Sequence, residues 1–415
     1  MTRQLFHGGR LFDGTGAEPA PADVAVEDGR IVAVGSGLDG DTAIDVTDRT
    51  LFPGFFDCHV HVTFSHVDLW REAQTPFSYR FFEAAANLRR TLEGGVTTIR
   101  DAGGADLGVK QAVVDELTPG PRMQISLAML SQTGGHGDGW LPSGNTLTFI
   151  LGHPGIPNTI VDGPDEMRRA VRELVRMGAD VIKVATSGGV LSPRDDPRHA
   201  HFRPAELDVL VEEATAAGIW VMAHAQGADG IKNAIRAGIR SIDHGIYLDD
   251  EAIELMKARG TWFVPTLVAP QGVLDAVAAG VQLPPAIVDK ARMVLDIHRS
   301  AFKHAVEAGV RIAMGTDAGT PFNRHGANAQ ELALMVEGGL SPADTIVAAT
   351  RSAAELLDLL DVTGTVEPGK AADLLIVDGD PLADIRILGD RDRLAGILKD
   401  GRWVRRARPL GGPLT

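Results

Sequence analysis

Histidine, lysine and aspartate side chains stand near the C-terminal ends of several short apolar stretches of this sequence. They are His59, His61, Lys183, His224, His244 and Asp317. His59 and His61 are two residues apart, so on a β-strand both side chains point to the same face. Two imidazoles on one face can bind one divalent metal ion. A single histidine at a strand end is more often a hydrogen-bonded core residue, so the metal hypothesis depends on all six residues together.

Lys183 and Asp317 add charges that a simple apolar core does not need. Lys183 lies between Ile182 and Val184, and lysine is rarely buried without a charged partner. The alternative is a lysine whose ammonium group reaches water from the strand end. Asp317 could similarly be no more than the cap of the next helix. The six residues form one site only if the C-terminal ends of their strands meet, which core packing does not require.

Short β-branched stretches and helical patterns alternate through the middle of the chain. The strand candidates are residues 55–61, 96–101, 123–129, 181–185, 219–224, 241–244, 262–267 and 311–317. Helical patterns, such as 165–177, 204–217 and 295–308, end at glycines. Eight strand–helix units predict an α/β fold, a (β/α)8 TIM-like barrel with the ionisable residues at its C-terminal mouth. A doubly wound open sheet is the competing fold, but the Gly-rich phosphate turn expected after its first strand is absent from this sequence.

The two ends of the chain share a different pattern. Residues 24–34 are two apolar stretches around the turn Asp28-Gly29, and residues 396–404 repeat this pattern around Asp400-Gly401. Neither end is long enough to form a solid core alone. We therefore predict that residues 1–53 and 364–415 form one small composite β-sandwich domain, and that residues 54–363 form the barrel.

The six ionisable residues resemble the metal ligands of the amidohydrolase superfamily, in its binuclear branch with a carboxylated lysine. The segment Asp57-Cys-His-Val-His61, preceded by Pro53-Gly54, is similar to the strand-one motif of that family. The resemblance implies two divalent metal ions, bridged by N6-carboxylated Lys183 and a hydroxide. The other ligands would be His59, His61 and Asp317 for one ion, and His224 and His244 for the second.

Carboxylation of a lysine requires the neutral amine, and burial between apolar neighbours favours that form. The carbamate then supplies the anion that a bridge between two cations needs, whereas a free lysine with a pKa near 10.4 is itself a cation. Zinc suits imidazole and carboxylate ligands, so we expect two zinc ions, with manganese, cobalt and iron as alternatives.

Four further motifs resemble those of Xaa-Pro dipeptidase (prolidase)-like and imidazolonepropionase-related metallohydrolases. They are residues 98–104, 131–138, 185–193 and 264–267. This resemblance implies hydrolysis of a peptide-like amide bond to a C-terminal amino acid, in a dipeptide, an Xaa-Pro substrate or an N-acyl amino acid. The metal-bridging hydroxide would attack the carbonyl, and Asp317 would pass its proton to the leaving nitrogen.

The loops that follow the predicted strands supply candidates for substrate binding. His136, in a Gly-rich loop, could polarise the scissile carbonyl or hold the developing oxyanion. A substrate α-carboxylate would pair best with arginine, because the planar guanidinium donates two parallel hydrogen bonds. Gln226 stands where dipeptide-cleaving relatives often have a tyrosine, which predicts a wider pocket. The predicted substrate-binding residues are His136, Gln226, Arg194, Arg203 and Arg324.

Other functions are compatible with parts of this pattern. An imidazolonepropionase-like enzyme would open a cyclic amide with the same ligands. A mononuclear deaminase typically lacks the bridging lysine and has a glutamate shortly after the strand-five histidine, whereas Ala225, Gln226 and Gly227 follow His224 here. A catalytically silent scaffold would be expected to have lost ligands, and all six are present.

Composition limits the partners of the protein. The 415 residues include 40 Lys+Arg and 55 Asp+Glu, and the net charge of −15 disfavours nucleic-acid binding. A single cysteine excludes a disulfide scaffold. No apolar stretch approaches the ~18–20 residues that span a bilayer, so we expect no membrane partner. We expect a cytoplasmic enzyme that acts on a small-molecule substrate. The resemblance to the amidohydrolase superfamily also implies a homo-oligomer.

Overall fold

The computed structural model describes residues 2–66, 69–147, 152–192 and 195–406, which fold into two compact units. The terminal unit contains Met1–Asp57, Arg89–Thr98 and Gly326–Thr415. The central unit contains Cys58–Leu88 and Ile99–His325. Residues 54–57, 89–98 and 326–363, which we assigned to the barrel from the sequence, therefore belong to the terminal unit.

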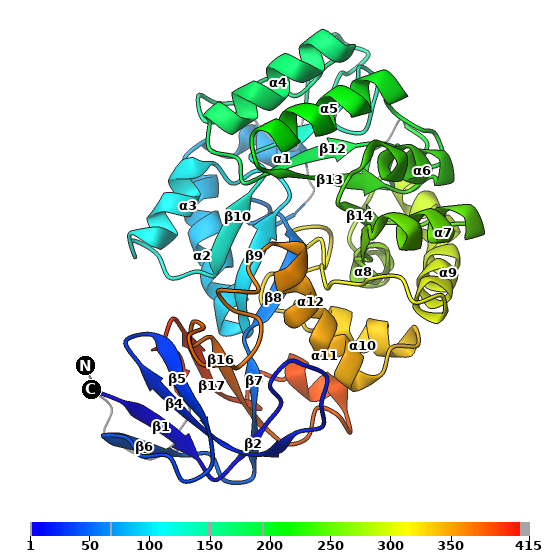
Figure 1. Cartoon of the computed structure of the whole chain (residues 1–415). Coiled ribbons are helices and arrows are strands. Elements are labelled where there is room, and N and C mark those ends of the chain that lie inside the picture. Colours follow the sequence, from blue (N-terminus) through cyan, green and yellow to red (C-terminus); the bar gives the residue numbers. More distant parts are fainter. Residues whose placement is uncertain (1, 67–68, 148–151, 193–194, 407–415) are drawn as a thin grey trace. The chain divides into compact units, whose positions relative to one another are not determined.

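The terminal unit contains two sheets (Figure 1). A four-stranded sheet has the order β5-β4-β1-β6, with β1 (Gln4–His7), β4 (Asp23–Glu27), β5 (Arg30–Gly35) and β6 (Thr42–Asp45). A six-stranded sheet has the order β18-β17-β16-β7-β2-β3, with β2 (Arg10–Leu11), β3 (Ala20–Pro21), β7 (Arg49–Pro53), β16 (Leu374–Asp378), β17 (Leu394–Lys399) and β18 (Arg402–Arg406). Strands β7 and β16 pair antiparallel, so the two ends of the chain share one sheet.

Both predicted hairpins are present in the terminal unit. Asp28 and Gly29, between β4 and β5, have φ values of 51° and 79°, which a two-residue type I′ turn requires at both positions. The two sheets bury one apolar cluster that includes Phe6 and Ile44 from the four-stranded sheet and Leu51 from the six-stranded sheet. The unit also contains α10 (Gln330–Glu337), α11 (Pro342–Ala348), α12 (Arg351–Leu356) and the short 3-10 helix η1 (Ile385–Gly389).

The central unit is built on parallel strands. Its five-stranded sheet has the order β11-β12-β13-β14-β15, with β11 (Met129–Leu130), β12 (Val181–Ala185), β13 (Trp220–Ala225), β14 (Ser241–His244) and β15 (Trp262–Val264). A three-stranded sheet has the order β10-β9-β8, with β8 (Phe55–Val60), β9 (Val96–Asp101) and β10 (Arg122–Ile125). Strands β8 and β9 begin in the terminal unit and end in the central unit.

Residues 311–318 link the two sheets of the central unit. Cys58 N at β8 donates to Met314 O over 2.9 Å, and Ala313 N donates to Phe263 O of β15 over 3.0 Å. Because β10 and β11 are consecutive pieces of one stretch of chain, the strands follow one another in a closed order, as a barrel requires. The predicted eighth strand makes only isolated bridges rather than a continuous ladder.

Helices follow most of these strands, and α4 to α7 lie on one side of β12 to β14 in Figure 1. The helices are α1 (Leu69–Gln74), α2 (Tyr79–Glu93), α3 (Leu107–Val114), α4 (Pro164–Arg176), α5 (Pro204–Ala216), α6 (Ala228–Ala237), α7 (Asp250–Arg259), α8 (Val268–Ala278) and α9 (Pro285–Glu307). Helix α9 begins at Pro285 rather than at residue 295. No helix in the described part of the chain combines the length and the apolar character needed to cross a bilayer.

The register of the parallel sheet decides where the polar side chains meet. His224 at the end of β13 lies opposite Ala185 of β12, and His244 at the end of β14 lies opposite Ala225 of β13. Lys183 lies two residues earlier on β12. The ends of these strands therefore bring the ionisable residues to one edge of the sheet.

Candidate active site

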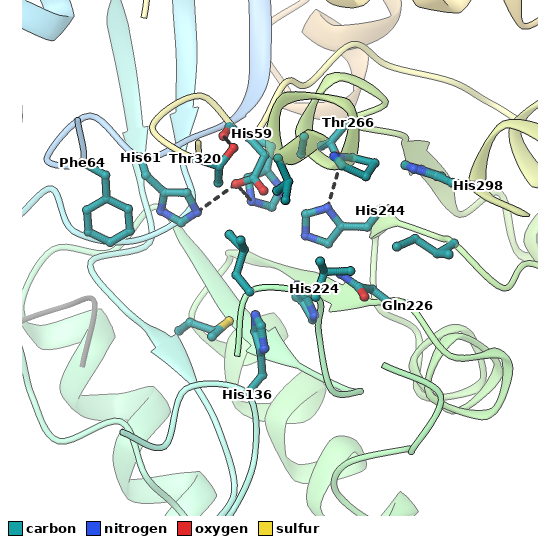
Figure 2. Close-up of a pocket in the computed structure, with 18 of the residues that line it drawn as sticks. His59, His61, Phe64, His136, His224, Gln226, His244, Thr266, His298 and Thr320 are labelled. Atoms are coloured by element: carbon teal, nitrogen blue, oxygen red, sulfur yellow. Dashed lines mark hydrogen bonds and ion pairs between the residues drawn. The ribbon is translucent and has the colours of Figure 1, made fainter. Parts of the chain in front are cut away.

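The six predicted metal ligands line one cavity of the central unit (Figure 2). The cavity encloses about 910 Å³, including the part that is open to solvent. Its wall includes His59, His61, Lys183, His224, His244 and Asp317. They come from the ends of β8, β12, β13 and β14 and from residues 311–318, so the structure brings all six together.

The ligand atoms of this cluster lie within a few ångströms of one another. Asp317 Oδ1 is 3.3 Å from His61 Nε2 and 3.5 Å from His59 Nε2. Lys183 Nζ is 3.4 Å from His59 Nε2. The ring of His244 lies between two others, with centroids 4.9 Å from His59 and 4.6 Å from His224. Among the described residues, His59, His244 and Asp317 offer ligand atoms within 4.8 Å of one another, which could hold a metal ion.

Unusual backbone conformations accompany this cluster. His244, Thr266 and Asp317 have φ values of 75°, 52° and 62°, in the left-handed region that side-chain-bearing residues rarely adopt. His244 is the last residue of β14, Thr266 follows β15, Asp317 lies in the segment 311–318, and all three line the cavity. Such conformations persist where surrounding contacts enforce them, and they are typical of functional sites.

Hydrogen bonds at one ring nitrogen orient three of the four histidines, His59, His61 and His224. His59 Nδ1 donates to Asp243 Oδ2 over 2.7 Å, and His61 Nδ1 donates to Gly103 O over 2.8 Å. Because a carboxylate and a carbonyl only accept, Nδ1 of both rings carries a hydrogen, and in the neutral form of each ring the lone pair is on Nε2. In His224 the roles of the two nitrogens are reversed. Its Nε2 donates to Gly188 O over 3.2 Å, so in the neutral ring the lone pair is on Nδ1. Metal-binding histidines in proteins are oriented in this way.

The surroundings also keep most of these imidazoles neutral. Burial and then the positive charge of Lys183 hold the pKa of His59 well below its usual range. Burial does the same for the pKa of His224 and His244. For His61, burial acts to lower the pKa, but the hydrogen bond and charge of Asp317 outweigh it and raise the pKa. Neutral imidazoles are the form that binds metal ions.

Lys183 is 1% exposed and lies among these rings. Burial lowers the pKa of its amine to about 8, although the carboxylate of Asp243 opposes this shift. The neutral amine is therefore far more accessible near neutral pH than in an exposed lysine. This state is the one that carboxylation would need.

Asp243 and Arg100 belong to the site, and our sequence analysis gave neither a role. Asp243 is fully buried, and besides His59 it accepts hydrogen bonds from Ser241 Oγ at 2.8 Å and Arg100 Nη2 at 3.2 Å. Its Oδ2 lies 3.8 Å from Lys183 Nζ. The available signal was the polar pair Ser241 and Asp243 in a short buried strand, where alternate residues face the same side.

His136 and Gln226 also line the cavity, and the His136 ring points into it from its loop (Figure 2). The ring of His136 stacks on that of His224, with centroids 4.1 Å apart and planes at 15°. Gln226 is 5% exposed, and its amide oxygen is buried without a hydrogen-bond partner among the described residues. A buried amide oxygen in that state is ready to accept from a bound molecule.

Arg203 and Arg324, the two predicted arginines among the described residues, are not part of the cavity wall. Arg203 is exposed at the start of α5, where its backbone N donates to Glu206 Oε2 over 2.6 Å. Arg324 is exposed, with its guanidinium 5.4 Å from the ring centroid of Phe322. Arg194 lies outside the described residues.

Most of the remaining cavity wall is apolar. It comprises Phe64, Met129, Val190, Leu191, Ile246, Ala269, Pro270 and Val273. An apolar wall with a few convergent polar groups is typical of small-molecule sites. The cavity therefore fits a molecule with an apolar part beside a polar, reactive part.

Comparison with known proteins agrees with this geometry. Residues 50–404 match the amidohydrolase family. The chain belongs to the amidohydrolase family. It is 35% identical over 424 residues to the ochratoxinase of Aspergillus niger, covering 96% of this chain and 86% of the relative. Members of this family are generally metal dependent, so the histidine and aspartate cluster is a candidate metal centre.

Solved structures extend the similarity of this amidohydrolase. A prolidase in complex with N-methylphosphonate-L-proline is 35% identical, with a TM-score of 0.90 and coverage of 98% of this chain and 100% of the other. A Xaa-Pro dipeptidase with methionine in its active site is 33% identical, with a TM-score of 0.86 and coverage of 97% and 99%. The protein is therefore a hydrolase of amide bonds.

Asp243 provides a test of the metal centre. In Asp243→Asn, the His59 imidazole loses its anionic partner and the buried guanidinium of Arg100 loses its counter-charge, so we expect metal affinity to fall about 10- to 100-fold. Competition with a chelator measures this affinity directly. Ser241→Ala is the matched control, because it removes one neutral hydrogen bond to the same carboxylate. Unchanged metal affinity in Asp243→Asn would show that Asp243 does not support the ligands.

Proposed function

We propose that this amidohydrolase cleaves the amide bond to a C-terminal amino acid, in a dipeptide, an Xaa-Pro substrate or an N-acyl amino acid. The observation that carries the proposal is the gathering of Lys183, Asp317 and four histidines in one cavity with an apolar wall. The similar proteins support cleavage of this type of bond. One is a Xaa-Pro dipeptidase, and another is a prolidase in complex with N-methylphosphonate-L-proline. The closed strand order of the central unit supports a (β/α)8 barrel as the scaffold.

The proposed metal centre holds two divalent ions, for which zinc is the best fit to the ligands. His59, His61 and Asp317 would bind one ion, His224 and His244 the other, and N6-carboxylated Lys183 would bind both. The ring orientations of His59, His61 and His224, and the lowered pKa of His59, His224 and His244, support this assignment. When bound, such ions lower the pKa of a water molecule and polarise the substrate carbonyl.

Asp317 is the proposed proton carrier. Its carboxylate lies within 3.5 Å of two ligand nitrogens and on the cavity wall, so it can reach both the attacking water and the leaving nitrogen. It would take a proton from the water and deliver it to the amine as the C–N bond breaks. His136 would face the scissile carbonyl oxygen as it gains negative charge.

Gln226 and the apolar wall are the proposed determinants of the substrate. The amide of Gln226 can donate to the substrate carboxylate and accept from a substrate N–H. The apolar wall would favour apolar and aromatic amino acids over charged ones. With exposed Arg203 and Arg324 outside the cavity wall, we propose that Gln226 takes part in recognition of the carboxylate.

Lys183→Ala tests the bridging ligand. We expect metal content to fall from about two ions per chain, with loss of most activity, because no anion would then join the two cations. A short carboxylic acid added to this variant should restore part of the metal content and part of the activity. Lys110→Ala is a control, because Lys110 pairs with Asp180 and does not line the cavity. Full metal content and activity in Lys183→Ala would contradict the carboxylated-lysine assignment.

Asp317→Asn tests proton transfer. The substitution keeps the size of the side chain but removes the proton acceptor, so kcat should fall by about 10²- to 10⁴-fold. Metal content of the purified variant must be measured beside kcat, because the same carboxylate is a proposed ligand. A variant with normal kcat and only a raised KM would rule out the proton-carrier role.

Amidation of the substrate carboxylate tests the substrate class. A hydrogen bond to a charged group contributes about 1.5–3 kcal/mol, so kcat/KM should fall roughly ten- to a hundred-fold on the amidated substrate. Gln226→Leu should remove much of that difference. Equal rates on the free acid and the amide would reject recognition of a carboxylate. They would favour a neutral or cyclic amide, the type of substrate expected of an imidazolonepropionase-like enzyme.

A further inference from the structure

The loop between β12 and α5 holds a charged cluster behind His136. The described residues of this loop, 186–192 and 195–203, include a buried carboxylate, Asp195, whose side chain is 3% exposed. Asp195 Oδ2 lies 3.2 Å from His136 Nδ1 and accepts from Gly189 N over 2.9 Å. Ser192 Oγ lies 2.8 Å from the same His136 nitrogen and donates to Asp195 Oδ1.

Lys290 of α9 anchors this loop. Its ammonium donates to the carbonyl oxygens of Gly189 at 2.9 Å, Ser192 at 2.7 Å and Asp195 at 2.5 Å. It also lies 3.3 Å from Asp195 Oδ1. An ammonium group has three N–H donors, and all three are directed to one loop. A lysine used in this way holds Gly189, Ser192 and Asp195 together rather than serving as a surface charge.

The loop backbone also lies directly against the His136 ring. A Cβ atom on Gly189 would lie 2.2 Å from His136 Cε1, so only glycine fits at this position. The ring stacks on His224 as well, with centroids 4.1 Å apart. The imidazole is thus held by a stacked ring, by the loop backbone and by hydrogen bonds at Nδ1.

We infer that Asp195 and Lys290 are positioning residues that hold His136 with Nδ1 committed to the loop and Nε2 left for the substrate. This inference rests on the role proposed for His136 above. Burial acts to raise the pKa of Asp195, but hydrogen bonds from His136 and Ser192 and the charge of Lys290 outweigh it and lower the pKa to about 2. An ionised carboxylate only accepts, so His136 Nδ1 carries the hydrogen in this contact.

A catalytic group gains from such support because small misplacements are costly. An error of about 1 Å in the position of a group that acts on the substrate can reduce the rate about 10²-fold. Without Asp195, the ring of His136 could change tautomer and rotate, which would present the wrong nitrogen to the carbonyl oxygen. The expected effect of losing Asp195 is therefore on kcat more than on KM.

A double-mutant cycle tests whether Asp195 acts through His136. Asp195→Asn should lower kcat about 10- to 100-fold with full metal content. In a His136→Ala background, the same substitution should change kcat by less than about threefold, because the group that it positions is gone. Asp196→Asn is the matched control, since Asp196 pairs with Arg198 rather than with His136. Equal losses of kcat in both backgrounds would overturn the inference.

A second measurement does not depend on the substrate. NMR spectra of 15N-histidine-labelled, zinc-loaded enzyme report the tautomer of each ring, and His136→Ala assigns the signals of His136. We expect a single tautomer with the hydrogen on Nδ1 in the wild type and in Asp196→Asn, and a mixture in Asp195→Asn and Lys290→Met. An unchanged tautomer in Asp195→Asn would overturn the inference. If no amide substrate is hydrolysed, the proposed function fails, while the spectra still decide the positioning role.

Discussion

The buried carboxylate of Asp243 is the interaction on which the polar interior of the central unit depends. It contacts His59 from β8 and Arg100 from β9, and it lies 3.8 Å from Lys183 of β12. A buried charge without a partner costs several kcal/mol, and the carboxylate of Asp243 and the guanidinium of Arg100 would each face that cost alone. Because its contacts come from three other strands, Asp243 also links distant parts of the strand order. The orientation of the site residues and the packing of these strands therefore both depend on the carboxylate of Asp243.

The same arrangement explains why the imidazoles are fixed before any ligand binds. The partners of His59, His61 and His224 at the second nitrogen are a carboxylate or backbone carbonyls, all of which are acceptors held by strands and by the turns that follow them. Rotating any of these rings would leave a buried polar group unpaired, at a cost of about 1–3 kcal/mol. These contacts consequently hold the three rings in their places on the cavity wall.

Sequence patterns predicted the position of most elements because hydrophobic period and glycine breaks are local signals. The helices 165–177 and 204–217 differ from α4 and α5 by one residue at their ends. The eighth strand was less predictable, since residues 311–318 make isolated bridges and Asp317 has a positive φ. Asp243, Asp195 and Lys290 were missed for another reason. Their partners lie far away in sequence, such as Arg100 for Asp243, and only the closed strand order brings them together.

The roles of loop residues were the least predictable from the sequence. Such a role depends on whether the side chain faces solvent or the cavity, and no local sequence pattern indicates this. Arg203 and Arg324 lie in segments expected at the mouth, yet both side chains are exposed and neither lines the cavity. The loop that precedes α5 also carries Val190 and Leu191, and the segment after β11 carries His136, and these three residues do line the cavity. Strand ends therefore hold the proposed metal ligands, whereas loops and α8 supply most of the surface that would contact a substrate. A change in Gln226 or in the apolar wall could then alter the preferred amino acid without disturbing the network around Asp243. Under the proposed function, such a separation would allow proteins about one third identical to this chain to include both an ochratoxinase and a Xaa-Pro dipeptidase.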